Sequence, residues 1–199
     1  MKKIKIIGAG LFGCCIGYEL HRAGHNVTII EQDSDIMQRA SKCNHNRIHF
    51  GFHYPRSVET AKQSLDGLIS FFTNYREAIV SHFPNYYMIA KDNSNVTAEE
   101  YIEFCNKAGI HYMDPSSDLF YNEILVDKTL LQLAIKTDES IFDYDILKSL
   151  VKDSIKDIDI KFNTVFDGNI HDCDYLINTT YAGINTVNAG AGLTGGGSA

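Results

Sequence analysis

Apolar residues at the start of the chain alternate between short runs and a segment with helical spacing. The run from Ile4 to Ile7 is rich in β-branched residues and has the length of a buried parallel strand. From about Leu11 the apolar residues recur on one face of a helix, and a second β-branched run follows at 27–30 and ends at Glu31. This pattern predicts a strand, a helix and a second strand at the start of an α/β fold.

Glycines occupy the predicted turn between the first strand and the helix. Gly8, Gly10 and Gly13 have the spacing G-x-G-x-x-G, with Leu11 and Phe12 in between. In the dinucleotide-binding fingerprint the first glycine allows a tight turn, the second lets a pyrophosphate approach the backbone, and the third allows close packing of helix on strand. Because a helix N-terminus offers free N–H groups and a positive dipole end, we predict that this turn holds a pyrophosphate.

An acidic residue at the end of the second strand supports the same interpretation. Glu31 follows Gly8 by 23 residues, and a carboxylate at that place accepts hydrogen bonds from the hydroxyls of an adenosine ribose. It also repels a 2′-phosphate, which disfavours NADP. Gln32, the next residue, is a further candidate contact. The alternative is a glycine-rich turn in some other α/β protein.

The rest of the pattern predicts both helices and strands. Helices are expected at 36–40, 57–82, 97–108 and 145–156. Strands are expected at 86–90, 158–162 and 173–183, and at 119–121 and 123–126, while 129–136 fits a strand or a short helix. Ser57, Thr97 with Glu100, and Gly109 are the expected helix caps. Asp167-Gly168 predicts a tight β turn.

The stretch from Arg47 to Tyr54 alternates like a strand. Arg47, His49, Gly51 and His53 then share one face, and the other face is apolar. Two histidines and an arginine are unusual on a plain surface. Together with the glycine fingerprint, they make His49, His53 and Arg47 the candidate catalytic residues. A glycine in mid-strand also predicts that something bulky passes close to the backbone. The alternative is a pair of strand histidines bonded to neighbouring carbonyls.

Composition narrows the class of protein. The 199 residues are 44% hydrophobic, which suits one large domain or one and a half, and the net charge is −7 with no basic stretch. A nucleic-acid or anionic-membrane partner is therefore not expected. The chain opens on a strand and has no apolar run of membrane-spanning length, so we expect a cytoplasmic protein without a signal peptide. The five cysteines include no C-x-x-C, so we expect no metal site, and Cys14 and Cys15 fit small apolar roles in the first helix.

Taken together, the GAGLFG turn, Glu31, the segment Arg39-Ala40-Ser41 and the stretch from Asn46 to Pro55 resemble FAD-dependent oxidoreductases of the D-amino-acid-oxidase-like type, which are related to glutathione reductase. Members oxidise amines, amino acids and 2-hydroxy acids. The resemblance implies a Rossmann-like α/β domain that binds FAD, with a parallel sheet, and part of a mixed α+β substrate domain.

The resemblance also implies roles for particular residues. It places Arg39, Ala40 and Ser41 near the FAD pyrophosphate, and the stretch from Asn46 to Gly51, with His49, beside the flavin ring; in a few relatives a histidine at that place is bonded to the flavin. The segment 173–183 corresponds to a late strand whose closing turn approaches the cofactor, which makes candidates of Thr179, Thr180 and Gly183.

The implied domains are discontinuous. Residues 1–82 and 140–188 would form the FAD domain, and 83–139 part of the substrate domain. The glycine-rich segment 189–199 has the composition of a flexible linker. Since the resemblance extends over about the first half of such an enzyme, we expect a truncated form that holds FAD weakly or not at all.

Three hypotheses follow. The first is an FAD-dependent oxidoreductase that passes a hydride from a small amine, amino acid or hydroxy acid to the flavin, with Arg47 or Arg56 holding a substrate carboxylate. The second is a non-catalytic nucleotide-binding remnant that depends on a partner, either a second copy or a missing C-terminal half. The third, an NAD-dependent dehydrogenase, leaves the stretch from Asn46 to Pro55 unexplained.

Overall fold

The computed structural model describes residues 1–192 and divides into two compact units. Unit 1 combines Met1–His45 with the chain from Tyr144 onward, and unit 2 is Asn46–Asp143. Segment 46–82 thus packs with the residues expected in the substrate domain, whereas the sequence suggested that it belongs with the first strands. The division of labour between a cofactor domain and a substrate domain stays a prediction.

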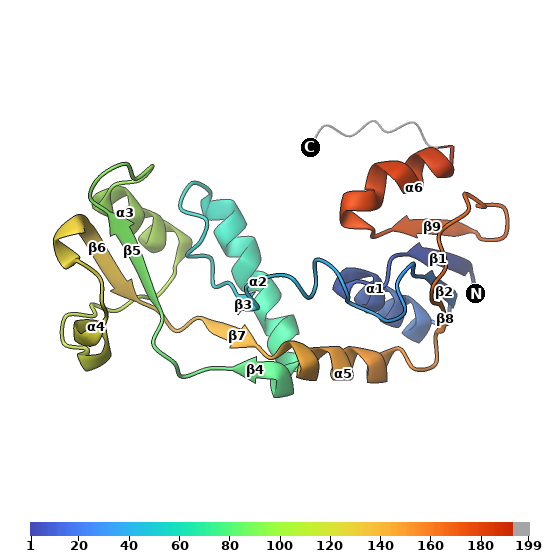
Figure 1. Ribbon diagram of the computed structural model, residues 1–199, viewed down its shortest axis with the longest axis horizontal. Coiled ribbons are helices and arrows are strands. Elements are labelled where there is room, and N and C mark those ends of the chain that lie inside the picture. Colours follow the sequence, from blue (N-terminus) through green and yellow to red (C-terminus); the bar gives the residue numbers. More distant parts are fainter. Residues whose placement is uncertain (193–199) are drawn as a thin grey trace. The chain divides into compact units, whose positions relative to one another are not determined.

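Unit 1 is built on a four-stranded parallel sheet (Figure 1). The strand order is β8-β2-β1-β9, made from β1 (Lys3–Ile7), β2 (Asn26–Ile30), β8 (Asp159–Lys161) and β9 (Tyr175–Asn178). β1 lies in the middle and pairs in parallel with both β2 and β9. Ile6 and Ile29 are fully buried, as the β-branched runs predict. The predicted α/β class with a parallel sheet is confirmed.

In unit 1, residues 1–45 and 144–192 contain the helices α1 (Leu11–Arg22), α5 (Tyr144–Ser154) and α6 (Ile184–Gly190), with a 3-10 turn at Tyr181–Gly183. The helix expected at 36–40 is absent, since Met37 has a positive φ of 58° that no α-helix accepts. The flexible tail is expected from residue 189, but Ala189 and Gly190 belong to α6, so that start is wrong. Residues 193–199 of the expected tail lie outside the described residues.

The connection from β8 to β9 crosses the sheet without helix or strand of its own. The turn predicted at Asp167-Gly168 forms no hairpin, because no strand flanks it, although Gly168 has a φ of 86°. Lys5 ties this segment down: its Nζ donates to the Asn169 carbonyl at 2.9 Å and to Asp172 Oδ1 at 2.5 Å. The polar side chain in β1 therefore anchors a loop.

Unit 2 holds two small antiparallel sheets and three helices (Figure 1). One sheet has the order β3-β7-β4, from Arg47–Ile48, Ser140–Phe142 and Ile79–Val80. The other pairs β5 (Tyr86–Ala90) with β6 (Leu131–Lys136), so 129–136 is mainly strand. The helices are α2 (Val58–Asn74), α3 (Ala98–Ala108) and α4 (Leu119–Glu123), and 3-10 turns lie at Arg76–Ala78 and Lys128–Leu130.

A buried cluster forms the core of unit 2 between α2, α3 and the β5–β6 pair. Its members are Phe52, Ala61, Ile89, Tyr101, Phe104, Cys105, Ala108, Ile110 and Ile135. The predicted caps of these helices are confirmed. Ser57 Oγ accepts from the Thr60 N–H, Thr97 and Glu100 form a capping box, and Gly109 ends α3 with a φ of 73°.

Two predictions for unit 2 are wrong for local reasons. The residues 119–121 form a helix and 123–126 form no strand, because Asp118 Oδ1 accepts from the Phe120 and Tyr121 N–H groups and caps a helical turn. The helix expected at 57–82 ends at Asn74, and a 3-10 turn then leads into β4.

The strand expected from Arg47 to Tyr54 stops after Ile48. Gly51 has a φ of 100°, and the Tyr54 N–H donates to the Gly51 carbonyl, so the chain turns here. A Cβ on Gly51 would lie 3.0 Å from both Ala61 Cβ and the Ala61 carbonyl oxygen. The sequence predicts that something bulky passes close to the backbone at Gly51, and in the structure this neighbour is helix α2. No helix among residues 1–192 is long and apolar enough to cross a membrane.

Candidate functional site

The carboxyl ends of the central strands of unit 1 bring three predicted segments to one edge of the sheet. These are the glycine-rich turn after β1, Glu31 after β2, and residues 179–183 after β9. From β1 the sheet continues through β2 and β8 on one side and through β9 on the other, so the strand order reverses at β1. Open parallel sheets bind ligands at such a switch point.

The glycine-rich turn has the geometry that its spacing predicts. Gly8 has a φ of 102°, which a side chain rarely tolerates. A Cβ on Gly13 would lie 2.0 Å from the Gly8 carbonyl oxygen, so α1 can pack on this turn only without a side chain there. Gly10 is the N-cap of α1, with extended backbone, and Phe12 in the first turn is 79% exposed. Gly10 and Gly13 therefore place no side chain of their own at the helix N-terminus, and a bound group can come close to the backbone there.

Glu31 is buried against this turn. Its Oε2 accepts from the Ala9 N–H at 2.6 Å and its Oε1 from the Asp33 N–H at 2.9 Å. A carboxylate has about four acceptor positions, so these two bonds leave capacity for ribose hydroxyls. The acid that the sequence singles out for the ribose thus also shapes the glycine-rich turn.

The segment 39–41 reaches the same helix N-terminus. Ser41 Oγ accepts from the Leu11 N–H at 3.0 Å, so a hydroxyl lies at the first turn of α1. Arg39 is exposed and forms a bidentate ion pair with Asp33, at 2.7 and 2.9 Å, and this hydrogen bonding lowers the pKa of Asp33. Gln32 and Ala40 are exposed beside them.

The turn after β9 contacts the glycines directly. The Thr179 hydroxyl lies 2.9 Å from both the Ile7 and Gly8 carbonyl oxygens. Thr180 donates through its N–H and its hydroxyl to Asn178 Oδ1, and the Gly183 N–H donates to the Thr180 carbonyl. Sequence reasoning missed Asn178, whose amide group organises this turn; a polar residue at the end of an apolar strand was the available signal.

Unit 2 contains a buried carboxylate, Glu139, that accepts several hydrogen bonds and that the sequence analysis also missed. The Glu139 side chain has no exposed surface. Its Oε2 accepts from Arg47 Nη2 at 2.8 Å and from the Tyr87 hydroxyl at 2.9 Å, and its Oε1 accepts from the Phe50 N–H at 2.8 Å. The Arg47 guanidinium also bonds Asn85 Oδ1 and lies over the Tyr87 ring. Burial, followed by the Glu139 charge, raises the pKa of Tyr87.

The two candidate histidines lie together although no strand aligns them. The rings of His49 and His53 stack with centroids 5.3 Å apart, and Tyr54 packs edge-on against both. His49 is half-buried, with its Nδ1 4.0 Å from Glu139 Oε1, whereas His53 is exposed. Asn46, at the start of this segment, has a φ of 52°, and its carbonyl accepts from the Phe142 N–H.

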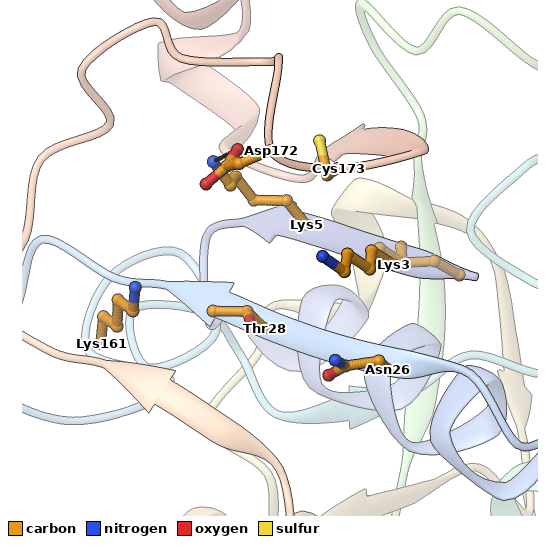
Figure 2. Close-up of a pocket in the computed structure, with 8 residues that line it drawn as sticks. Lys3, Lys5, Asn26, Thr28, Lys161, Asp172 and Cys173 are labelled. Carbon is orange, nitrogen blue, oxygen red and sulfur yellow. Dashed lines mark hydrogen bonds and ion pairs between the residues drawn. The ribbon is translucent and has the colours of Figure 1, made fainter. Parts of the chain in front are cut away.

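A small polar cavity of about 80 Å³ lies on the sheet of unit 1, apart from the glycine-rich turn (Figure 2). Lys3 and Asn26, which begin β1 and β2, line it together with Ile4, Lys5, Thr28, Lys161, Asp172 and Cys173. Figure 2 shows Lys5 directed toward Asp172, as their ion pair requires. Lys5 is already paired with Asp172, and Lys3 and Lys161 are the other two lysines of the cavity.

Cys14 and Cys105 are buried and fit packing roles, whereas Cys43 is exposed. Cys14 is fully buried, and burial, with Cys15 and Glu31 nearby, raises its pKa to about 12. A thiol so protonated is a poor nucleophile. Across residues 1–192 we find no group of three or more His, Cys, Asp or Glu side chains placed to hold a metal ion.

Comparisons with known proteins match the chain to one family. The family model "FAD dependent oxidoreductase" (DAO) matches residues 3–194. The chain is 39% identical over 80 residues to FAD-dependent monooxygenase kojA of Aspergillus flavus, and 33% identical over 115 residues to FAD-dependent monooxygenase FPY4 of Fusarium mangiferae. These alignments cover 40% and 57% of this chain, and 19% and 31% of those proteins.

Two solved structures share the fold. L-proline dehydrogenase from P. horikoshii aligns with a TM-score of 0.71 at 20% identity, over 97% of this chain and 56% of that one. Glycine oxidase from Geobacillus kaustophilus aligns with a TM-score of 0.72 at 15% identity, over 98% and 60%. The chain therefore spans little more than half the length of these two enzymes.

Proposed function

Because this chain belongs to the DAO family of FAD-dependent oxidoreductases, we propose that unit 1 binds the adenosine diphosphate part of FAD and that unit 2 contributes to oxidation of a small substrate. The substrate class we propose is an amine, an amino acid or a hydroxy acid. FAD is the cofactor of this family and supplies the hydride acceptor. Catalysis by the whole protein is part of the proposal, because this chain aligns with only 56% and 60% of the two solved enzymes.

The residues of unit 1 fit this cofactor. The observation that carries the proposal is the pairing of the Gly8–Gly13 turn, which a Cβ would obstruct, with the buried Glu31 carboxylate bonded to Ala9. We propose that the N–H groups at the start of α1 and the Ser41 hydroxyl hold the pyrophosphate, and that Glu31 holds the adenosine ribose. Further proposed contacts are Leu11, Phe12, Gln32, Arg39, Ala40, Thr179, Thr180 and Gly183.

In unit 2 we propose His49 and His53 as the groups that accept a proton from the substrate. A neutral imidazole nitrogen accepts a proton at neutral pH, and the exposed His53 can pass it to water. Asn46, Arg47 and His49 are also proposed cofactor contacts. Because Arg47 is engaged with Glu139, we propose that the exposed Arg56 is the arginine that binds a substrate carboxylate.

Substitution of Glu31 tests this function. Glu31→Gln replaces the charged carboxylate that would accept from the ribose hydroxyls by a neutral amide. The amide keeps one oxygen that can accept from the Ala9 N–H. A hydrogen bond to a charged group contributes about 1.5–3 kcal/mol, so we expect FAD affinity to fall about tenfold to a hundredfold. Isothermal titration with FAD measures it, and Glu19→Gln, an exposed acid on α1, is the matched control.

The alternatives give other results. An NAD-dependent dehydrogenase would bind NAD more tightly than FAD. A non-catalytic remnant would bind FAD and depend on Glu31, but would not reduce it with any amine, amino acid or hydroxy acid. Equal FAD affinity of the wild-type and Glu31→Gln proteins would contradict the assignment of the ribose to this acid.

A further inference from the structure

The buried Glu139 carboxylate joins parts of unit 2 that are far apart in sequence. It receives hydrogen bonds from Arg47, Phe50 and Tyr87, at sequence separations of 92, 89 and 52 residues. A buried carboxylate is costly unless donors surround it, and here both oxygens are satisfied. Hydrophobic residues of similar volume commonly stabilise a fold at least as well as a buried ion pair. The cost of burying the Glu139 carboxylate therefore suggests that this residue has a role besides stability.

The two oxygens of Glu139 contact opposite ends of one short segment. Oε2 accepts from the side chain of residue 47, and Oε1 accepts from the backbone N–H of residue 50. β7 begins at Ser140, which pairs with Ile48 in β3, so the residue just before β7 is placed beside this segment. Glu139 therefore bridges the point where the chain leaves the sheet.

His49 lies inside the bridged segment. Its backbone carbonyl accepts from Ser64 Oγ of α2 at 2.8 Å, and its ring stacks on His53. The backbone on both sides of His49 is thus fixed, by Glu139 at positions 47 and 50 and by α2 at position 49 itself. The turn at Gly51 then returns His53 to the His49 ring.

We propose that Glu139 is a positioning residue, which clamps residues 47 and 50 and thereby holds His49 in its stack on His53. The proposal rests on the proposed function of those two histidines as proton acceptors. It extends that function by assigning the group that fixes their geometry, while Arg47 serves mainly to compensate the Glu139 charge.

Nuclear magnetic resonance on the full chain without FAD tests the clamp. With labelled histidine, we expect a nuclear Overhauser contact between the His49 and His53 rings in the wild-type protein. The contact should be lost in Glu139→Gln, where an amide replaces an acceptor oxygen. It should persist in Tyr87→Phe, which leaves the Arg47 and Phe50 bonds intact, and in Glu103→Gln, an exposed acid on α3 paired with Lys107.

A second variant covers the case in which Glu139→Gln does not fold. Arg47→Met combined with Glu139→Leu leaves no buried charge and removes both ends of the clamp. We expect this double variant to melt cooperatively and to lack the ring contact. A ring contact that persists in either variant would overturn the proposal. Because the readout needs no FAD, a protein that keeps the contact but fails to bind FAD would refute the proposed function instead.

Discussion

The glycine-rich turn of unit 1 and the Glu139 cluster of unit 2 both centre on one buried carboxylate, but they are assembled differently. Glu31 bonds backbone N–H groups at separations of 22 and 2 residues, within a single strand–helix–strand unit. Glu139 bonds side chains and a backbone N–H that are 52 to 92 residues away. The first site is encoded locally, and the second exists only once unit 2 has folded.

This difference decides what a substitution does in each place. A local site fails when the backbone no longer fits, so its glycines are the critical positions. A long-range site fails when one member of a charge pair is removed, because the partner stays buried. The predictions below test that contrast.

The largest effect is expected at Gly13. A Cβ there would lie 2.0 Å from the Gly8 carbonyl oxygen, so α1 must shift from β1 in Gly13→Ala. We expect unit 1 to lose at least about 3 kcal/mol of stability, comparable to a severe packing defect. Urea unfolding measures the loss. Gly67→Ala in α2 is the control, since its Cβ meets open space and should stabilise the helix by about 0.5–1 kcal/mol. Equal stability of both variants would contradict the packing described.

Glu139→Gln comes next. It leaves Arg47 without a charged partner, and because the Arg47 side chain is 26% exposed we expect the lower end of the usual cost, about 3 kcal/mol. Thermal and urea unfolding give the value. The double variant Arg47→Met with Glu139→Leu should recover most of it. If the double variant is less stable than Glu139→Gln, the cost of that substitution does not come from the uncompensated charge of Arg47.

Much of unit 1 is predictable because its signals are short-range. The Gly8–Gly13 spacing, the strand to Ile30 and the acid at 31 all lie in one continuous stretch, and the structure places them as expected. Ser41 also lies at the start of α1, where its hydroxyl accepts from the Leu11 N–H. The roles of these residues toward FAD stay predictions.

The region 46–54 shows where sequence reasoning fails. The alternation of polar and apolar residues predicts a strand, but Gly51 turns the chain so that α2 can approach. His49 and His53 still meet, by way of the turn. Glu139 carried no local signal, since it follows a polar stretch and finds its donors only through the pairing of Ser140 with Ile48.

The smallest effect concerns pH in unit 1. Burial alone would raise the pKa of Asp35, but hydrogen bonds from Lys148 and Lys152 of α5 and from the Ile36 N–H bring it down to about 2. A lowered pKa in the folded state stabilises the protein above the unfolded value near 4, and this stability is lost as the pH falls from about 4 to 2. With allowance for solvent screening we expect about 1 kcal/mol.

Asp35→Asn checks this pH effect. Its unfolding free energy should fall less steeply than that of the wild-type protein between about pH 4 and 2, and the two should differ most at neutral pH. Asp66→Asn, an exposed acid on α2, is a suitable control. Parallel pH curves for the wild-type and Asp35→Asn proteins would show that the Asp35 contacts do not contribute.

The central claim is that the turn after β1 and Glu31 hold the adenosine diphosphate part of FAD. Equilibrium dialysis of the full chain against FAD, ADP and FMN tests it most directly, because FMN carries the flavin without the adenosine diphosphate. The account predicts that FAD and ADP bind and compete with each other, and that FMN binds much more weakly. FMN binding as tight as FAD binding, with no competition from ADP, would contradict it.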